Sequence, residues 1–108
     1  MNLLELKNKL EKGKSLGGEV VYIKEESLIS GIESIYKDQE EKKITLLKSN
    51  EETIRVDDLL KLLDELYASI GDGEVFTGNN EYFREECKDI QSLEFAQYEL
   101  IKMIFINI

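Results

Sequence analysis

Residues 17–28 read GGEVVYIKEESL, and residues 72–83 read DGEVFTGNNEYF. Each stretch follows a leucine-rich segment with helical spacing and precedes a run in which polar and apolar residues alternate. In both, glycine marks a turn, and the β-branched and aromatic residues after it predict a short strand. Because the same order of features occurs twice, the sequence predicts a tandem duplication of one structural unit.

The two leucine-rich segments align without a gap. Leucines fall on leucines at every step, Leu3, Leu4, Leu6 and Leu10 over Leu59, Leu60, Leu62 and Leu66. Further along, Gly18 to Val20 fall over Gly73 to Val75, and Ile32 falls over Cys87. We therefore expect a single domain over residues 1–108, built from pseudo-repeat units at 1–56 and 57–108. The alternative is that common local rules produced two unrelated helix-and-strand units.

The first unit reads as a helix, a strand and a β-hairpin. Leu3, Leu6 and Leu10 form an apolar helical stripe, with Asn2 as N-cap and Glu5 placed as in a capping box. Three glycines are expected to end the helix and form the turn after it, Gly13, Gly17 and Gly18. The strand is expected at 19–25, and the hairpin arms at 28–36 and 43–48, with a bulge at Gly31.

The second unit is expected to repeat this order. Asp57 or Asp58 is placed to cap a helix that ends before Gly71. The strand at 73–77 follows, and residues 81–94 are ambiguous: the repeat favours a strand at about 85–91, whereas the spacing of Phe83, Cys87 and Ile90 also fits a helix. The fold class is therefore α+β, with two helix–strand–hairpin units sharing one core.

The apolar segment 99–108, ELIKMIFINI, is typical of a central strand covered on both faces. Together with the second helix it predicts a set of largely buried residues, Leu62, Leu66, Ile101, Met103 and Ile104.

The composition limits the classes of partner. The chain has 23 acidic and 14 basic residues, a net charge of −9, and this argues against direct binding to nucleic acid or to an anionic membrane. The charge favours a basic protein surface instead. A single cysteine fits a reducing compartment, and charges interrupt the first apolar residues, so we expect a cytoplasmic protein without a signal peptide; the resemblance described below implies that the cytoplasm is that of a bacterial host cell.

The negative charge lies almost entirely in the second half. Residues 1–56 hold 11 acids and 10 bases, whereas residues 57–108 hold 12 acids and 4 bases. One interpretation is that the acids only solvate the surface. The other is that they form a face that competes for a basic groove by imitating phosphates. The candidate partner-binding residues are Asp72, Glu74, Glu81, Glu85, Glu86, Asp89, Glu94 and Glu99.

Histidine, the residue type most often used in general acid–base catalysis, is missing, and a pair of carboxylates is the alternative that the 23 acidic residues leave open. The chain has no histidine, so it lacks the commonest general base and any cysteine–histidine nucleophile. Cys87 is expected to be a small core residue, and one cysteine cannot build a structural zinc site. Neither glycine-rich turn continues into a phosphate-binding loop. We therefore expect no enzyme activity, no cofactor and no metal.

Two hypotheses follow from the residues. The first is a non-enzymatic acidic protein that blocks a basic partner, one that handles nucleic acid. The second is a structural or assembly component, with a homodimer as one form, that associates through its apolar C-terminal strand.

The first half also carries a resemblance. The stripe Leu3, Leu6 and Leu10, with the strands at 19–23 and 44–47, resembles the helix–strand–hairpin pattern of small proteins from bacteriophages and prophages of low-GC bacteria. The resemblance covers about half of the chain and rests on hydrophobic spacing. It implies a mobile-element origin and, by analogy, an inhibitor of host defence such as an anti-CRISPR protein.

Overall fold

The computed structural model describes residues 1–79 and 87–108. Its elements follow the chain in the order α1 (Leu3–Ser15), β1 (Val20–Glu25), β2 (Leu28–Asp38), β3 (Lys43–Ser49), β4 (Ile54–Arg55), α2 (Val56–Ile70), β5 (Glu74–Asn79), β6 (Lys88–Asp89), β7 (Ser92–Tyr98) and β8 (Ile101–Asn107). The fold class is α+β, as predicted. None of the helices within the described residues is long and apolar enough to cross a membrane.

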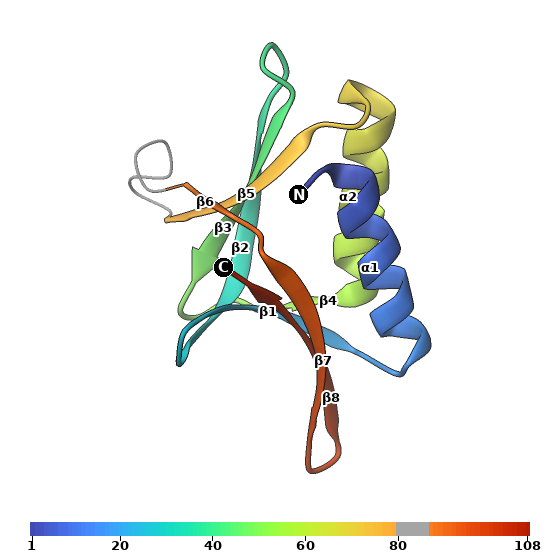
Figure 1. Ribbon diagram of the computed structural model, residues 1–108, viewed down its shortest axis with the longest axis vertical. Coiled ribbons are helices and arrows are strands. Elements are labelled where there is room, and N and C mark those ends of the chain that lie inside the picture. The colour runs from blue at the N-terminus through green and yellow to red at the C-terminus, as the bar shows by residue number, and fades with distance from the viewer. Residues whose placement is uncertain (80–86) are drawn as a thin grey trace.

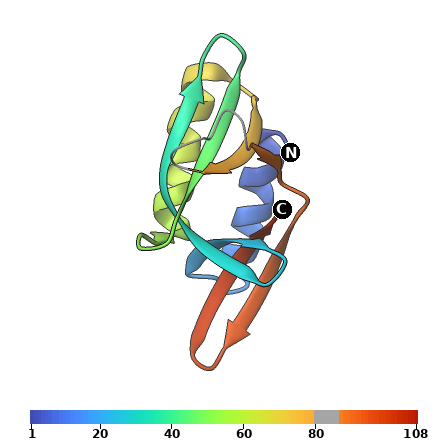
Figure 2. The ribbon, with the colours of Figure 1, turned by 90° about the vertical axis from the view of Figure 1, so that its left-hand side faces the viewer.

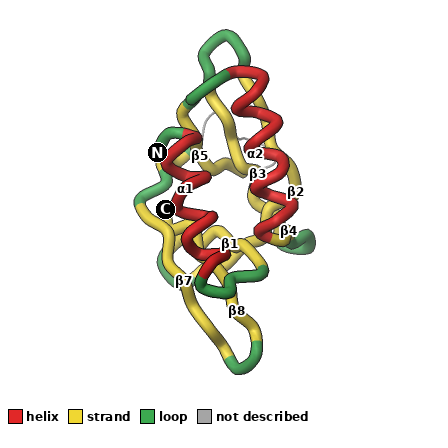
Figure 3. Tube along the Cα trace, turned by 90° about the vertical axis from the view of Figure 1, so that its right-hand side faces the viewer, coloured by secondary structure: helices red, strands yellow, loops and turns green. Residues whose placement is uncertain are grey.

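The strands form one curled mixed sheet, and the two helices lie side by side against it (Figures 1 and 3). The strand order is β6-β5-β3-β2-β1-β8-β7, with β4 paired to β1. Two neighbouring pairs are parallel, β1 with β8 and β3 with β5, and the others are antiparallel. The β2–β3 and β7–β8 hairpins project at opposite ends of the molecule (Figure 2).

The core lies between the helices and one face of the sheet. The fully buried side chains come from both helices and from both parallel strand pairs, among them Leu6, Leu10, Val21, Ile44, Leu59, Leu63, Val75 and Ile104. Packing the two helices on the same face buries the apolar stripe of each, which an isolated helix of this length does not achieve in water.

Helix α1 follows most of its sequence pattern. The side chain of Asn2 accepts a hydrogen bond from the Glu5 N–H at 2.9 Å, as an N-cap does. Leu3, Leu6 and Leu10 are fully buried. The expected end at Gly13 is wrong, because the helix continues to Ser15. The turn follows at Gly17, whose φ is 103°.

Gly13 has a different role, which is close packing. It lies inside α1, where an added Cβ would be 2.6 Å from Cδ1 of Ile104. The missing side chain therefore lets the helix approach β8.

Helix α2 corrects two expectations. It begins at Val56 with Arg55 as N-cap and no capping side chain, so neither Asp57 nor Asp58 caps it. It also buries a different stripe: Leu59 and Leu63 are fully buried, whereas Leu62 is 40% exposed. The aligned residues Leu6 and Leu62 therefore do not have matching environments, whereas Leu3 and Leu59 are both fully buried.

The backbone hydrogen bonds at the start of each helix account for this difference between the buried stripes. The N–H of Leu3 donates to the Gly73 carbonyl at 2.8 Å, and the N–H of Val56 donates to the Glu19 carbonyl at 2.9 Å. Leu3 and Val56 are therefore each held, as the first residue of a helix, by a backbone hydrogen bond to the residue just before a strand. In the sequence alignment Leu3 falls on Leu59, which lies three residues after the start of α2.

The first hairpin has the predicted arms, as β2 and β3. Its irregularity lies between Ile32 and Ser34, just after the expected Gly31. Gly31 instead marks a close approach of two backbone segments, since a Cβ there would lie 1.7 Å from the Glu52 carbonyl oxygen.

The second half contains strands where the sequence was ambiguous. Lys88–Asp89 forms β6 and Ser92–Tyr98 forms β7, so the helical alternative is wrong for these residues; Glu81, Glu85 and Glu86 lie outside the described residues. Strand β8 is central between β1 and β7, as expected.

Only some of the residues of α2 and β8 that the sequence predicted to be buried are buried. Ile104 is buried, whereas Ile101 is 52% exposed because it lies at the projecting hairpin turn. Leu66 and Met103 are half-buried. The expected burial of Cys87 is wrong: it precedes β6, at the end of the sheet, and its side chain is exposed.

Candidate functional site

Three of the candidate carboxylates lie around the N-terminal end of α1. We call Asp72, Glu74 and Asp89 the carboxylate cluster. Asp72 lies in the turn between α2 and β5, Glu74 begins β5, and Asp89 lies on β6. The antiparallel pairing of β5 with β6 and the bridge between Asn2 and Glu74 bring these segments to the start of the helix.

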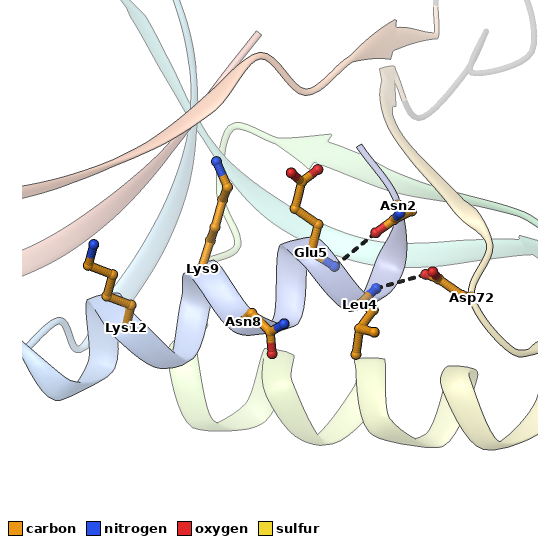
Figure 4. A pocket seen from close by; sticks show the side chains of 7 residues that line it. All are labelled: Asn2, Leu4, Glu5, Asn8, Lys9, Lys12 and Asp72. Carbon is orange, nitrogen blue, oxygen red and sulfur yellow. Dashed lines mark hydrogen bonds between the residues drawn. The ribbon is translucent and has the colours of Figure 1, made fainter.

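Backbone contacts hold the cluster in place. The N–H of Val75 donates to the Met1 carbonyl at 2.8 Å, and the N–H of Glu74 donates to the Lys42 carbonyl at 3.0 Å. The Asp72 carboxylate accepts a hydrogen bond from the Leu4 N–H at 2.9 Å (Figure 4). Since Glu74 and Asp89 are anchored by strand pairing and Asp72 by the N-terminus of α1, the cluster has a fixed geometry.

The cluster is partly neutralised. The Met1 amino group lies 3.5 Å from the Glu74 carboxylate and 4.0 Å from that of Asp89. The side chains of Glu74 and Asp89 are nevertheless 57% and 62% exposed. Negative charge here also complements the positive end of the α1 dipole, which is a purely structural reason for acids at this position.

An open depression of about 440 Å³ adjoins the cluster along α1 (Figure 4). Its lining residues are Asn2, Leu4, Glu5, Asn8, Lys9, Lys12 and Asp72. Charge changes sign along it: Glu5 and Asp72 lie at the N-terminal end of the helix, and Lys9 and Lys12 lie further along. Within the depression, the negative side chains therefore lie at the N-terminal end of α1.

The remaining candidates lie elsewhere. Glu94 is on β7, where its carboxylate is 3.7 Å from the Lys24 ammonium. Glu99 is in the β7–β8 turn, away from the start of α1 (Figure 1). The structure thus brings together three of the five described candidates and separates two. The sequence does not show which candidates lie together because the grouping depends on the pairing of β5 with β6. That pairing brings Asp89 of β6 next to β5.

A carboxylate outside the cluster, that of Glu25, has a pKa shifted by a lysine. The Lys88 ammonium donates a hydrogen bond to the Glu25 carboxylate, and this bond holds the pKa of Glu25 below its usual range. The contact joins β1 with β6 and is a link between the two halves of the chain.

A cavity of about 400 Å³ contains the sole cysteine of the sequence. It is lined by Tyr36, Asp38, Glu41, Lys43, Thr45, Phe76 and Cys87. Lys43 lies 3.1 Å from the Glu41 carboxylate and faces the Phe76 ring at 5.9 Å. In residues 1–79 and 87–108, no three histidine, cysteine, aspartate or glutamate side chains come together as metal ligands.

The outward face of β1, β8 and β7 is apolar except where Lys24 of β1 and Glu94 of β7 form an ion pair. Residues that pair across these strands and point away from the helices are Val20, Tyr22, Ala96, Tyr98, Ile101, Met103 and Phe105. The rings of Tyr22 and Phe105 lie 6.3 Å apart, and the Lys24 ammonium is 5.1 Å from the Phe105 ring. Because β8 is paired on both sides, only its side chains remain for association.

Comparison with known proteins gave no match: no family model fits the chain, and neither a curated protein nor a solved structure is similar to it.

Proposed function

We propose that this protein is a non-enzymatic, acidic interaction protein that binds a basic surface of a protein that handles nucleic acid. The carboxylate cluster is the surface proposed to make the contact. The observation that supports it is the convergence of Asp72 and Glu74, at the start of β5, with Asp89 of β6 around the first residues of α1, where Glu74 and Asp89 are exposed. Carboxylates on a rigid scaffold present negative charges at fixed spacing, as a phosphate backbone does.

The biological role that follows is inhibition. A carboxylate surface that occupies a basic groove excludes the nucleic acid that normally binds there. Within the proposal, the resemblance to phage and prophage proteins places this inhibition in the cytoplasm of a bacterial host, directed at a host-defence protein in the manner of an anti-CRISPR protein. The net charge of −9 supports fast association with a basic target.

The test is capture of a partner from bacterial lysate by two variants of equal charge. The first is Asp72→Asn, Glu74→Gln and Asp89→Asn together, in which the new amide oxygen at position 72 can still accept the hydrogen bond from the Leu4 N–H. The matched control is Glu11→Gln, Glu40→Gln and Glu99→Gln, three exposed acids that are not part of the cluster. We expect the cluster variant to lose the partner and the control to retain it. Equal retention by both would remove the cluster from the function.

A second candidate function is assembly through the outward apolar face of β1, β8 and β7. The observation that favours it is exposure at the β7–β8 turn, where Tyr98 is 70% and Ile101 is 52% exposed. A homodimer that buries this face is expected to dissociate in the variant Tyr98→Ser and Ile101→Ser. Sedimentation velocity over a range of protein concentrations tests this, and a wild-type protein that is monomeric throughout would exclude it.

We also propose that the chain consists of two pseudo-equivalent units, residues 1–56 and 57–108. Two correspondences support this. The first residue of each helix donates a backbone hydrogen bond to the residue just before a strand, Leu3 to Gly73 before β5 and Val56 to Glu19 before β1. Each unit contributes a strand, β1 or β5, that pairs in parallel with a hairpin strand of the other. Superposition of the two units in an experimental structure, with Leu6 on Leu59, tests the proposal.

A further inference from the structure

Strand β7 has one edge without a strand partner. Within the described chain, β7 pairs only with β8 and is the last strand on that side of the sheet. Such an edge presents unpaired N–H and C=O groups to any extended segment that comes alongside. The edge is therefore able to accept one more strand.

A groove of about 260 Å³ lies between β7 and the C-terminal half of α1. The residues that line it are Lys9, Lys12, Gly13, Leu16, Leu93, Glu94, Phe95 and Ile104. Leu16 is 52% exposed and Phe95 is half-buried, so the apolar part of the groove is open to solvent.

The charged part of the groove is positive. Lys9 and Lys12 are exposed and neither forms an ion pair with another described residue. The carboxylate of Glu94, the one acid in the lining, lies 3.7 Å from the Lys24 ammonium. A groove with two uncompensated lysines selects an acidic occupant. Two copies of this chain that met edge to edge at β7 would place the lysines of both at one interface, which is unfavourable.

We propose that the free edge of β7 and this groove bind an extended acidic peptide segment of a partner. The added strand pairs with β7, and its residues two apart point to the same side. One inward side chain is apolar and packs on Leu16 and Phe95, and the inward side chain two residues away is acidic and meets Lys9 and Lys12. This site has the opposite charge preference to the carboxylate cluster and does not depend on the proposed function.

The test uses fluorescein-labelled peptides and fluorescence anisotropy. The probe GSETLTEGS places an acid on each side of leucine at a spacing of two, so either strand direction is accommodated. The two comparison peptides are GSKTLTKGS, with reversed charge, and GSETGTEGS, without the apolar residue. We expect the first peptide to bind at least about tenfold more tightly than either of the others.

Matched protein variants locate the site. Lys9→Glu with Lys12→Glu is expected to weaken binding of GSETLTEGS about tenfold or more, whereas Lys61→Glu, an exposed lysine on α2, leaves it unchanged. Leu16→Ser is expected to weaken it several-fold, and Leu28→Ser, another exposed leucine far from the groove in the sequence, is the control. Hydrogen exchange of the β7 amides is expected to slow when the peptide binds.

Three results would overturn the inference. The first is no binding of GSETLTEGS below about 1 mM. The second is equal binding of the acidic peptides with and without leucine, which would mean attraction by charge alone. The third is a loss of binding in Lys61→Glu as large as the loss in Lys9→Glu with Lys12→Glu. Binding of the peptide without slower hydrogen exchange of the β7 amides would count in the same way.

Discussion

Helices α1 and α2 are both rich in leucine and pack side by side on the same face of the sheet, yet they bury different positions of the aligned pattern. Leu6 is fully buried, whereas Leu62, its partner in the sequence alignment, is 40% exposed. Leu59, three residues before Leu62, is fully buried like Leu6. A leucine-rich helix predicts that a face is buried, but when leucines cover more than one face the pattern does not specify which.

The contacts before each helix select the face. Strand β4 pairs with β1, and the N–H of Val56 donates to the Glu19 carbonyl, so α2 begins before the expected cap. Two ion pairs between the helices then support their antiparallel packing, Lys7 with Asp64 at 2.5 Å and Lys14 with Asp57 at 2.6 Å.

The largest expected effect is a loss of stability when a fully buried leucine of either helix is truncated, compared with truncation of the partly exposed Leu62. Leu6→Ala and Leu59→Ala each create a cavity in the core and are expected to lower the free energy of unfolding by about 2–5 kcal/mol. Leu62→Ala removes a partly exposed side chain and is expected to cost less than about 1 kcal/mol. Urea denaturation measures all three, and a cost for Leu62→Ala equal to that for Leu59→Ala would show that the face of α2 is wrongly assigned.

The next effect concerns the close approach of α1 to the sheet. Gly13→Ala adds a methyl group where Cδ1 of Ile104 is 2.6 Å away, and we expect a net loss of about 1–3 kcal/mol despite the better helix propensity of alanine. Combining it with Ile104→Val removes that Cδ1 atom, and the combined cost is expected to fall below the sum of the single costs. Additive costs in denaturation experiments would contradict the contact.

A smaller difference lies in the two N-caps. Asn2→Ala removes the hydrogen bond to the Glu5 N–H and is expected to cost about 1 kcal/mol. Arg55→Ala removes no capping bond, since the Arg55 side chain makes none, and is expected to change stability by less than about 0.5 kcal/mol. Equal losses of thermal stability in the two variants would show that the helices do not differ in this respect.

The smallest effect is the pH dependence of the contact between the halves. Because Lys88 lowers the pKa of Glu25 in the folded protein, the contact stabilises above the unfolded-state pKa of about 4.3, and this stabilisation is lost as pH falls through the folded-state pKa. The contribution of this solvent-exposed pair is expected to be under about 1 kcal/mol. Unfolding measured from pH 7 to 3 tests it against Glu25→Gln, whose stability should vary less over this range.

The sequence predicted most of the first half because its signals are local. An N-cap, a single leucine stripe and a hairpin with a polar tip are all decided by neighbours a few residues apart, and α1, β1, β2 and β3 lie where these signals indicate. In the second half, the face of α2 and the position of Cys87 depend on contacts distant in the chain. The alignment of Cys87 with Ile32 favoured burial, whereas its exposure results from its place before β6, the last strand on that side of the sheet.

The candidate site was also predictable only in part. The charge imbalance indicated the second half, and Asp72 and Glu74 are close in sequence. Asp89 joins them because β6 pairs with β5, whereas Glu94, five residues later, lies on β7 beside Lys24. Such grouping requires the order of strands in the sheet, which residue spacing alone does not supply.

The most direct test of the proposed function is the salt dependence of the association rate with the captured partner, measured by surface plasmon resonance. Long-range attraction to the carboxylate cluster predicts that the logarithm of the rate constant falls steeply with ionic strength for the wild type. The slope should be shallower for Asp72→Asn, Glu74→Gln and Asp89→Asn together, and less affected for Glu11→Gln, Glu40→Gln and Glu99→Gln. Identical slopes for the two triple variants would contradict an interaction through the cluster.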